Sequence, residues 1–440
     1  MSSVARQGRR GKKSRVLGEP DVLTPEAFAA MELDTKAELI QALIPLGLMA
    51  VAQTLEAEVT ALAGERYRRE GGRPDVVRHG SNPSSVRLGG QRVPIRVPRV
   101  RNVAQGCEVP LALLTTLRGA AGVVDETLLR RVLYGISCRN YEAAAEAVPG
   151  AIGLSASTVS RQFIKASAAK LRELQERDLS DLDIVAMFLD GKRFAEDTMV
   201  TALGVTLDGH KVVLGFVQAS TENAAVLTEF LRGLRARGLR IDRGILAVLD
   251  GSKGLRASVR RAFGKLAVVQ RCQWHKRKNV LEYLSKSERA WWCKRLQAAY
   301  QRPTYEEAKR ALQEVRRDLA DRNLSAVASL DEGVEETLTL HRLGLFPLLG
   351  ISLKTTNCLE SVFSLVEART ARVSSWKNSS HKQRWLATAL LDIEPRLRRI
   401  RGYRHLGLLR QAVQRELRLV AQGGDEPAAG EQEQTGKEVA

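Results

Sequence analysis

Two apolar runs in this chain end in the same Leu-Asp-Gly triplet. Residues 184–189 lead into Asp190, and residues 245–249 lead into Asp250, with a glycine after each aspartate. Short, wholly apolar runs of this kind indicate strands that are buried on both faces. A fold that contains both runs therefore needs a buried sheet in which each of two strands delivers a carboxylate to its exposed end.

A third acidic residue, Glu360, lies in the segment 355–361, and the apolar spacing that follows it is helical. Taken singly, each aspartate is typical of a solvated turn, and Glu360 is typical of a first helical turn. Together, two strand-end aspartates and a helical glutamate form an oxygen cage for divalent metal, because three clustered carboxylates repel one another unless a cation lies among them. Paired Mg²⁺ ions catalyse in-line displacement at phosphate.

The net charge indicates which kind of phosphate-containing molecule the chain acts on. The 440 residues include 69 Lys and Arg against 50 Asp and Glu, a net charge of +19 that is spread over much of the length. This favours a nucleic-acid partner over a membrane, since no basic amphipathic membrane helix and no bilayer-spanning stretch stands out. The alternative is a solvated, arginine-rich surface without a partner. Five scattered cysteines indicate reduced thiols in the cytosol.

From residue 183 onward, strand and helix patterns alternate. The predicted order is three strands, a helix, a strand, a helix and a strand, with a hairpin turn at Asp208-Gly209 between the second and third strands. This order is the ribonuclease H-like topology, with Asp190 on the first strand and Asp250 on the fourth. Because 110 residues separate Asp250 from Glu360 and their pattern is helical, we expect an all-α insertion there.

The predicted fold class is α/β: a ribonuclease H-like catalytic domain interrupted by an all-α insertion and preceded by helical and helix-turn-helix DNA-binding segments. The predicted parts, in chain order, are a disordered basic tail (1–20), a DNA-binding helical segment with a small β-hairpin near Gly89-Gly90 (21–120), a helix-turn-helix-like DNA-binding domain (121–180), the catalytic domain (181–275 and 351–418), the insertion (276–350) and a disordered acidic tail (419–440).

Three short helices are predicted between residues 125 and 171, the second over 141–147. The third, capped by Ser155 or Ser157, has an apolar side with Val159, Phe163 and Ile164, and a polar side with Ser157, Thr158, Ser160, Arg161 and Lys165. A helix-turn-helix presents such a polar, basic half to the major groove. Helical hairpins without DNA contacts are the alternative. The run Lys276, Arg277 and Lys278 would hold DNA backbone, with a solvated helix face as the alternative.

Cys272 and His275 have the spacing of half a zinc site. Structural zinc takes four ligands, and no second pair is evident, so we expect a packed cysteine and a hydrogen-bonded histidine with structural roles. Four tryptophans could stack on an unpaired base; we expect at least three to be core residues. They are Trp291, Trp292, Trp376 and Trp385.

Four motifs in this order carry a family resemblance. They are Asp190-Gly191, the segment 250–255, the segment 270–280 and the segment 355–361. Over residues 35–415 or so, the chain resembles the mutator-type family of bacterial insertion-sequence transposases. The resemblance implies a ribonuclease H-like DDE domain, Mg²⁺ or Mn²⁺ dependence, and N-terminal segments that recognise terminal inverted repeats. In one departure, Glu367 stands where such enzymes often carry Lys or Arg; Arg369 and Arg372 are the nearest basic candidates.

The expected function is therefore that of a DDE transposase. Asp190, Asp250 and Glu360 are the expected catalytic residues and the ligands of two Mg²⁺ or Mn²⁺ ions. The expected partners are double-stranded DNA, as transposon ends and target, and further copies of the chain in a homodimer or larger assembly within the bacterial cytoplasm, at the nucleoid. Two alternatives are a non-catalytic DNA-binding regulator derived from a transposase and a ribonuclease H-like nuclease.

Overall fold

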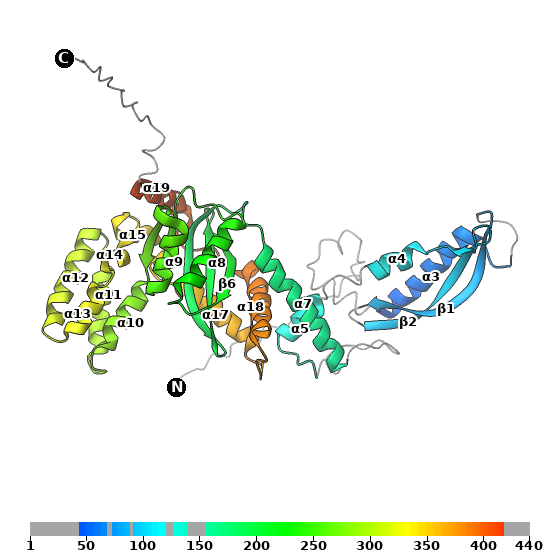
Figure 1. The fold of residues 1–440 in the computed structure, drawn as a ribbon, viewed down its shortest axis with the longest axis horizontal. Helices are drawn as coiled ribbons and strands as arrows, with labels where there is room; N and C mark the ends of the chain where they lie inside the picture. The colour runs from blue at the N-terminus through cyan, green and yellow to red at the C-terminus, as the bar shows by residue number, and fades with distance from the viewer. Residues whose placement is uncertain (1–43, 68–72, 89–90, 120–125, 140–154, 418–440) are drawn as a thin grey trace, which may run out of the picture. The chain divides into compact units, whose positions relative to one another are not determined.

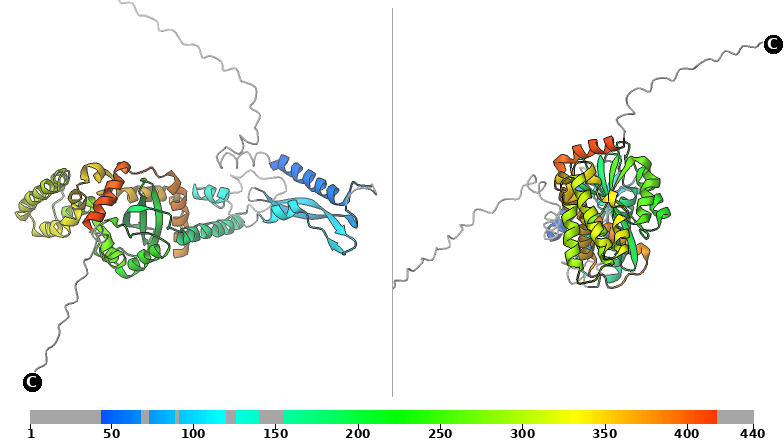
Figure 2. Two further views of the ribbon diagram at one scale, coloured as in Figure 1. Left: turned by 90° about the horizontal axis from the view of Figure 1, so that it is seen from above. Right: turned by 90° about the vertical axis from the view of Figure 1, so that its left-hand side faces the viewer.

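A computed structural model describes residues 44–67, 73–88, 91–119, 126–139 and 155–417 (Figures 1 and 2). The chain divides into two compact units. The first comprises residues 1–128 with 138–159, and the second comprises residues 129–137 with 160–440. Among the described helices, none has both the length and the apolarity that crossing a bilayer requires.

The first unit contains a long β-hairpin. Strands β1 (Val76–Leu88) and β2 (Gln91–Asn102) are antiparallel, β3 (Cys107–Glu108) pairs with β2, and helices α3 (Ile44–Ala63) and α4 (Ala112–Gly119) complete the described part of the unit. The core between α3 and the sheet consists of Leu55, Val59, Val97, Val100 and Leu111. The predicted hairpin is confirmed, and it is longer than the alternation of apolar residues indicated. Its Gly89-Gly90 turn lies outside the described residues.

Two of the three helices predicted after residue 125 are present as α5 (Glu126–Leu133) and α7 (Ala156–Glu176). The one predicted over 141–147 lies outside the described residues, so the helix-turn-helix stays a prediction. On α7, Val159 and Phe163 are buried as expected, but Ile164 is 45% exposed, so its placement on the apolar side was wrong. Helix α7 begins directly after Ser155, one of the two predicted caps.

A five-stranded mixed sheet forms the centre of the second unit (Figure 1). Its strand order is β6-β5-β4-β7-β8; β4 is antiparallel to β5 and parallel to β7. The strands are β4 (Ile184–Phe194), β5 (Asp197–Thr206), β6 (Lys211–Gln218), β7 (Ile245–Leu249) and β8 (Ala267–Arg271). All five predicted strands are confirmed. Strand β4 continues four residues past Asp190, so this aspartate lies within the strand. The prediction that it lies at the end of the strand was wrong.

Side chains of β4 alternate between the two faces of this sheet. Met187 and Leu189 belong to the core that the sheet forms with α8 (Ala224–Ala236) and α9 (Lys253–Phe263). Because side chains in a strand alternate, Asp190, Lys192 and Phe194 lie on the opposite face. Helices α17 (Asn357–Thr370), α18 (Ser379–Ile393) and α19 (Leu406–Glu416) follow in the chain, and α17 and α19 contact β4.

A helical segment with its own core lies between β8 and α17. Helices α10 (Gln273–Glu282), α11 (Arg289–Tyr300), α12 (Tyr305–Ala320) and α13 (Leu324–Asp331) surround a core that includes Leu296, Leu312 and Val315. The short helices α14 (Val334–Thr337), α15 (Thr339–Arg342) and α16 (Phe346–Leu353) lead to α17. Helix α12 begins directly after Thr304, whose side-chain oxygen accepts a hydrogen bond from the Glu307 backbone N–H.

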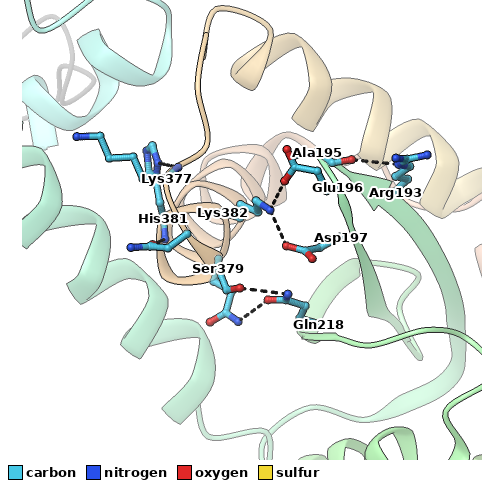
Figure 3. Close-up of polar contacts among 11 residues, drawn as sticks. Arg193, Ala195, Glu196, Asp197, Gln218, Lys377, Ser379, His381 and Lys382 are labelled. Atoms are coloured by element: carbon cyan, nitrogen blue, oxygen red, sulfur yellow. Dashed lines mark hydrogen bonds and ion pairs between the residues drawn. The ribbon is translucent and has the colours of Figure 1, made fainter.

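The β4–β5 hairpin is attached to α18 by a buried lysine (Figure 3). The Lys382 ammonium bonds to Glu196 at 2.5 Å and to Asp197 at 2.7 Å. Its side chain is only 8% exposed. The lysine therefore carries the counter-charge for two carboxylates that stand side by side at the hairpin turn.

Two of the four tryptophans are clearly core residues. Trp292 and Trp385 are buried. Trp376 is half-buried, with its ring centroid 4.9 Å from that of Phe194. Trp291 is 55% exposed and lies beneath the Arg295 guanidinium. The prediction that at least three of the four are core residues was therefore wrong, because only Trp292 and Trp385 are buried and Trp376 is half-buried.

Candidate metal centre

Parallel pairing of β4 with β7 brings the two aspartates together. Leu189 is in register with Leu249, and each is followed directly by an aspartate, so Asp190 and Asp250 lie side by side on neighbouring strands. At Gly251 the chain adopts φ +101 to turn from β7 toward α9, a conformation that favours glycine. The next residue, Ser252, caps α9, and its backbone N–H donates to Asp250 Oδ1 at 2.8 Å.

Helix α17 supplies the third carboxylate in its first turn, at Glu360. Oxygen atoms of Asp190 and Glu360 and a ring nitrogen of His275 all lie within 4.8 Å of one another. The Asp250 carboxylate is outside this group, although it is close enough to act on Asp190 electrostatically. The structure therefore brings two of the predicted ligands into one cluster, sets the third beside it, and adds a histidine.

The aspartates are held in an environment that disfavours their charged forms. The pKa of Asp190 is raised from 3.8 to about 7, first by burial and then by the Asp250 and Glu360 carboxylates, against a bond from the Thr356 hydroxyl. The pKa of Asp250 is also raised, chiefly by burial. Buried carboxylates that repel one another are the hard oxygen donors that Mg²⁺ and Mn²⁺ bind. The donor set therefore fits a divalent metal.

His275 was predicted to be a structural, hydrogen-bonded residue, and the structure places it against the carboxylates. Its Nε2 atom is 3.9 Å from Glu360 Oε1, and its Nδ1 atom is 3.5 Å from the Thr356 hydroxyl. Burial lowers its pKa to about 4, helped by Lys278, so the ring is neutral at pH 7. The C-x2-H spacing directly after β8 was the sequence signal that a histidine stands at this edge of the sheet.

Cys272 supports the start of α17. Its Sγ atom accepts a bond from the Thr356 N–H at 3.4 Å, and burial raises the pKa of the thiol. It belongs to no potential metal-ligand cluster in the described part of the chain. Cys272 and His275 thus both contact Thr356, which precedes α17 and positions Glu360.

Comparison with known proteins identifies the family. A sequence profile described as "Transposase, Mutator family" matches residues 22–398. The chain is 30% identical over 255 residues to the transposase for insertion sequence element IS6120 of Mycolicibacterium smegmatis, covering 56% of this chain and 77% of the relative. It is 27% identical over 352 residues to the transposase for IS905 of Lactococcus lactis subsp. lactis, covering 78% and 86%. The chain belongs to the Mutator family of transposases.

Membership gives the activity. The chain is an insertion-sequence transposase, an enzyme that cleaves DNA and transfers strands, and it is also 25% identical over 284 residues to the IS256 transposase of Staphylococcus aureus, covering 61% and 69%. The family implies divalent metals and binding of transposon DNA, in agreement with the Asp190, His275 and Glu360 cluster. The alternative of a non-catalytic regulator is thereby set aside.

The predicted DNA contacts on α7 occupy exposed or half-buried positions in the transposase. Ser157, Arg161 and Lys165 are exposed, whereas Thr158 and Ser160 are half-buried. The Ser155 hydroxyl bonds to the Thr158 hydroxyl at 3.0 Å. Their contacts with a DNA groove stay a prediction.

The basic run on α10 needs a correction at its first residue. Lys276 is fully buried, and its ammonium bonds to the carbonyl oxygens of Ser329 and Glu332. Burial lowers the pKa of this lysine to about 8. It therefore faces the protein interior and not a DNA backbone. Arg277 is half-buried and bonds to Gln297 at 3.0 Å, whereas Lys278 is exposed.

The basic candidates that follow Glu360 are both engaged within the protein. Arg369 bonds to Asp392 at 3.2 Å, and its guanidinium carbon lies 4.3 Å from the centre of the Tyr134 ring. Arg372 is exposed and bonds to the Gly135 carbonyl at 3.3 Å. Of the two, Arg372 keeps the freer position for a DNA contact.

Proposed function

We propose that this transposase cleaves DNA at the ends of its own insertion sequence and joins the freed 3′-hydroxyl to target DNA, with two Mg²⁺ or Mn²⁺ ions held by Asp190, Asp250 and Glu360. The observation that supports it most is that Asp190 and Glu360 lie in one cluster, with Asp250 close enough to act on Asp190, whose pKa is raised to about 7. Bound divalent ions would activate the attacking hydroxyl and stabilise the leaving 3′-oxygen.

The arrangement supports distinct roles for the three carboxylates. Both Asp250 and Glu360 act on Asp190 electrostatically and raise its pKa, so the Asp190 carboxylate is close to each of the other two. Asp190 is therefore the residue that would bridge a pair of ions. Asp250 and Glu360 would each complete one side. His275, neutral and 3.9 Å from Glu360, would orient that carboxylate.

We also propose the domain assignment that these roles require. The order β6-β5-β4-β7-β8, with three antiparallel strands followed by two parallel ones, supports a ribonuclease H-like catalytic domain over 181–275 and 351–418. The separate core of the intervening helices supports an all-α insertion over 276–350. The segments 21–120 and 121–180 would recognise terminal inverted repeats.

Because two ends must be brought together, the active form would be at least a homodimer, and it would act at the bacterial nucleoid. The net charge of +19 supports a polyanionic partner.

In vitro cleavage tests the proposal. The purified protein is incubated with Mg²⁺ and a duplex that carries the inverted repeats flanking the coding region. We expect specific nicks and joined products, and we expect Asp190→Asn, Asp250→Asn and Glu360→Gln to bind the duplex but to lose cleavage and joining. Asp242→Asn is a matched control, because Asp242 is exposed and precedes the opposite end of β7.

Two results would contradict the proposal. An active Asp190→Asn variant would exclude a metal centre built on this residue. Equal cleavage of an unrelated duplex, without joined products, would instead favour a ribonuclease H-like nuclease. Retained binding in the three variants separates a loss of chemistry from a loss of folding.

A further inference from the structure

Lys192 lies on the same face of β4 as Asp190. Two residues along a strand span about 7 Å, so the backbone of Lys192 lies about that far from that of Asp190, next to the metal centre. Its ammonium is 3.4 Å from Glu367 Oε1, and its side chain is 50% exposed. Glu367 is on α17, seven residues after Glu360, a rise of about 10 Å along the helix. Strand and helix therefore each carry a second charged residue on the same side of the site.

The charges of this pair are the reverse of the expected ones. The family resemblance predicts a basic residue two helical turns after the catalytic glutamate, but in this chain that position is occupied by Glu367. Of the two arginines that follow, Arg369 pairs with Asp392, and Arg372 lies past the end of α17, where it is exposed and bonds to the Gly135 carbonyl. The cation nearest to this position is supplied by the strand, as Lys192.

We propose that Lys192 contacts the DNA phosphate next to the one that is cleaved, in place of a basic residue on α17. This inference rests on the proposed function. An exposed pair between a lysine and a glutamate contributes little to stability, so exchange of the Glu367 carboxylate for a phosphate would cost little. Without DNA, Glu367 keeps the lysine directed toward α17; with DNA, the ammonium bonds to phosphate oxygen, also an anionic acceptor, and the release of counterions from the DNA favours the exchange.

The salt dependence of DNA binding tests this contact. Binding of the inverted-repeat duplex is measured without divalent metal, so that no cleavage occurs, over a range of salt concentrations. Loss of one phosphate contact lowers the slope of log K against log salt by about one. We expect that decrease in Lys192→Ala, together with weaker binding, and we expect Lys192→Arg to retain the slope.

Two matched variants separate a DNA contact from a structural ion pair. Glu367→Gln breaks the same pair but removes no cation, so its slope should equal that of the wild type. Lys265→Ala removes an exposed lysine that precedes β8, at the opposite end of the sheet from Asp190. It should leave the slope unchanged.

The proposal is overturned if Lys192→Ala keeps the wild-type slope, or if Glu367→Gln loses as much as Lys192→Ala, because the pair would then only stabilise the fold. These results differ from a failure of the proposed function. In that case the wild type would not cleave the duplex in Mg²⁺, and Lys192 would have no DNA end to contact. A wild type that cleaves normally while Lys192→Ala binds like Lys265→Ala refutes the role of Lys192 alone.

Discussion

Two acidic clusters lie along the strand pair β4–β5, and they differ in how their charge is balanced. At the hairpin turn, Glu196 and Asp197 both bond to the buried ammonium of Lys382 (Figure 3). At the metal centre, within the described residues, no lysine or arginine forms an ion pair with Asp190, Asp250 or Glu360, although Arg271 acts on Asp250 electrostatically and offsets part of the rise in its pKa. The histidine beside them is neutral at pH 7. The hairpin cluster therefore has its counter-charge within the protein, whereas the metal centre keeps an excess of negative charge that a bound cation would neutralise.

This difference separates structural carboxylates from functional ones. Burial of like charges opposes folding, and the raised pKa of Asp190 shows that the fold keeps such a site at the expense of stability. Perturbed groups of this kind cluster where a protein carries out chemistry. We therefore expect that the hairpin cluster can be neutralised without loss of function and that the metal centre cannot.

The largest expected effect is on catalysis. Asp190→Asn should lower end cleavage by at least about 10³-fold, because a metal contributes several kcal/mol of charge stabilisation and each 1.4 kcal/mol is about tenfold in rate. Asp197→Asn, on the same strand pair, should retain cleavage within a few-fold. Single-turnover cleavage of the inverted-repeat duplex measures both. Similar losses in the two variants would remove the contrast between the clusters.

The pH dependence of stability should differ as well. In the metal-free protein, folded Asp190 holds a proton up to a pKa of about 7, whereas the unfolded chain releases it near 3.8. This carboxyl therefore favours the folded state at low pH, and its contribution to stability falls as pH rises from about 4 to about 7, by up to about 4 kcal/mol. The lowered pKa values of His275 and His341 act in the opposite direction below about pH 6.5, so the contribution of Asp190 is the difference between the wild type and a variant without this carboxyl. Urea unfolding in a chelator at pH 5 and pH 8 measures this.

The control for that experiment is Asp190→Asn, which has no proton to exchange. It should lack the decrease in stability that Asp190 causes as pH rises, keep the opposite contribution of His275 and His341, and be more stable than the wild type at pH 8. Mg²⁺ should stabilise the wild type at pH 8 and have a much smaller effect on the variant. Parallel pH profiles in the two proteins would show that the buried carboxyl does not carry this energetic cost.

Much of the sheet was predictable because its signals are local. The wholly apolar runs before Asp190 and Asp250 and the Asp-Gly turn at 208–209 led to the five strands, and their order then placed the two aspartates together. The extension of β4 to Phe194 was not predictable, since Lys192 and Arg193 end the apolar run. Their pairing with β5 fixes them in the strand.

The site was less predictable because its remaining parts depend on distant contacts. Glu360 has the ordinary appearance of an acidic residue in a first helical turn, and only the motif around it indicated a role. Lys276 has the appearance of a surface cation within a basic run, yet its acceptors, Ser329 and Glu332, lie more than 50 residues away in the chain. A spacing pattern along one helix contains no information about such partners.

Lys276 is a further buried charge to compare with the two acidic clusters. Its positive charge is compensated by backbone carbonyl groups. Lys276→Ala should destabilise the second unit by about 3 kcal/mol or more, because it opens a cavity at a fully buried side chain and removes the ammonium from the Ser329 and Glu332 carbonyls, of which only the Glu332 carbonyl keeps a second donor, Arg271. Lys278→Ala, at an exposed position of the same helix, should change stability by less than about 0.5 kcal/mol. Urea unfolding compares them. Equal effects would mean that the ammonium of Lys276 is not buried in solution.

The smallest effect is expected at the hairpin cluster. Lys382→Ala should lower the melting temperature by a few degrees, because Glu196 and Asp197 then repel each other without a cation, while end cleavage stays within a few-fold of the wild type. Adding Glu196→Gln to this variant should restore part of the loss, since one of the two repelling charges is gone. Calorimetry of the single and double variants measures the coupling. If the second substitution instead destabilises the protein further, the two carboxylates do not depend on Lys382, and the balance of charge that distinguishes this cluster from the metal centre is absent.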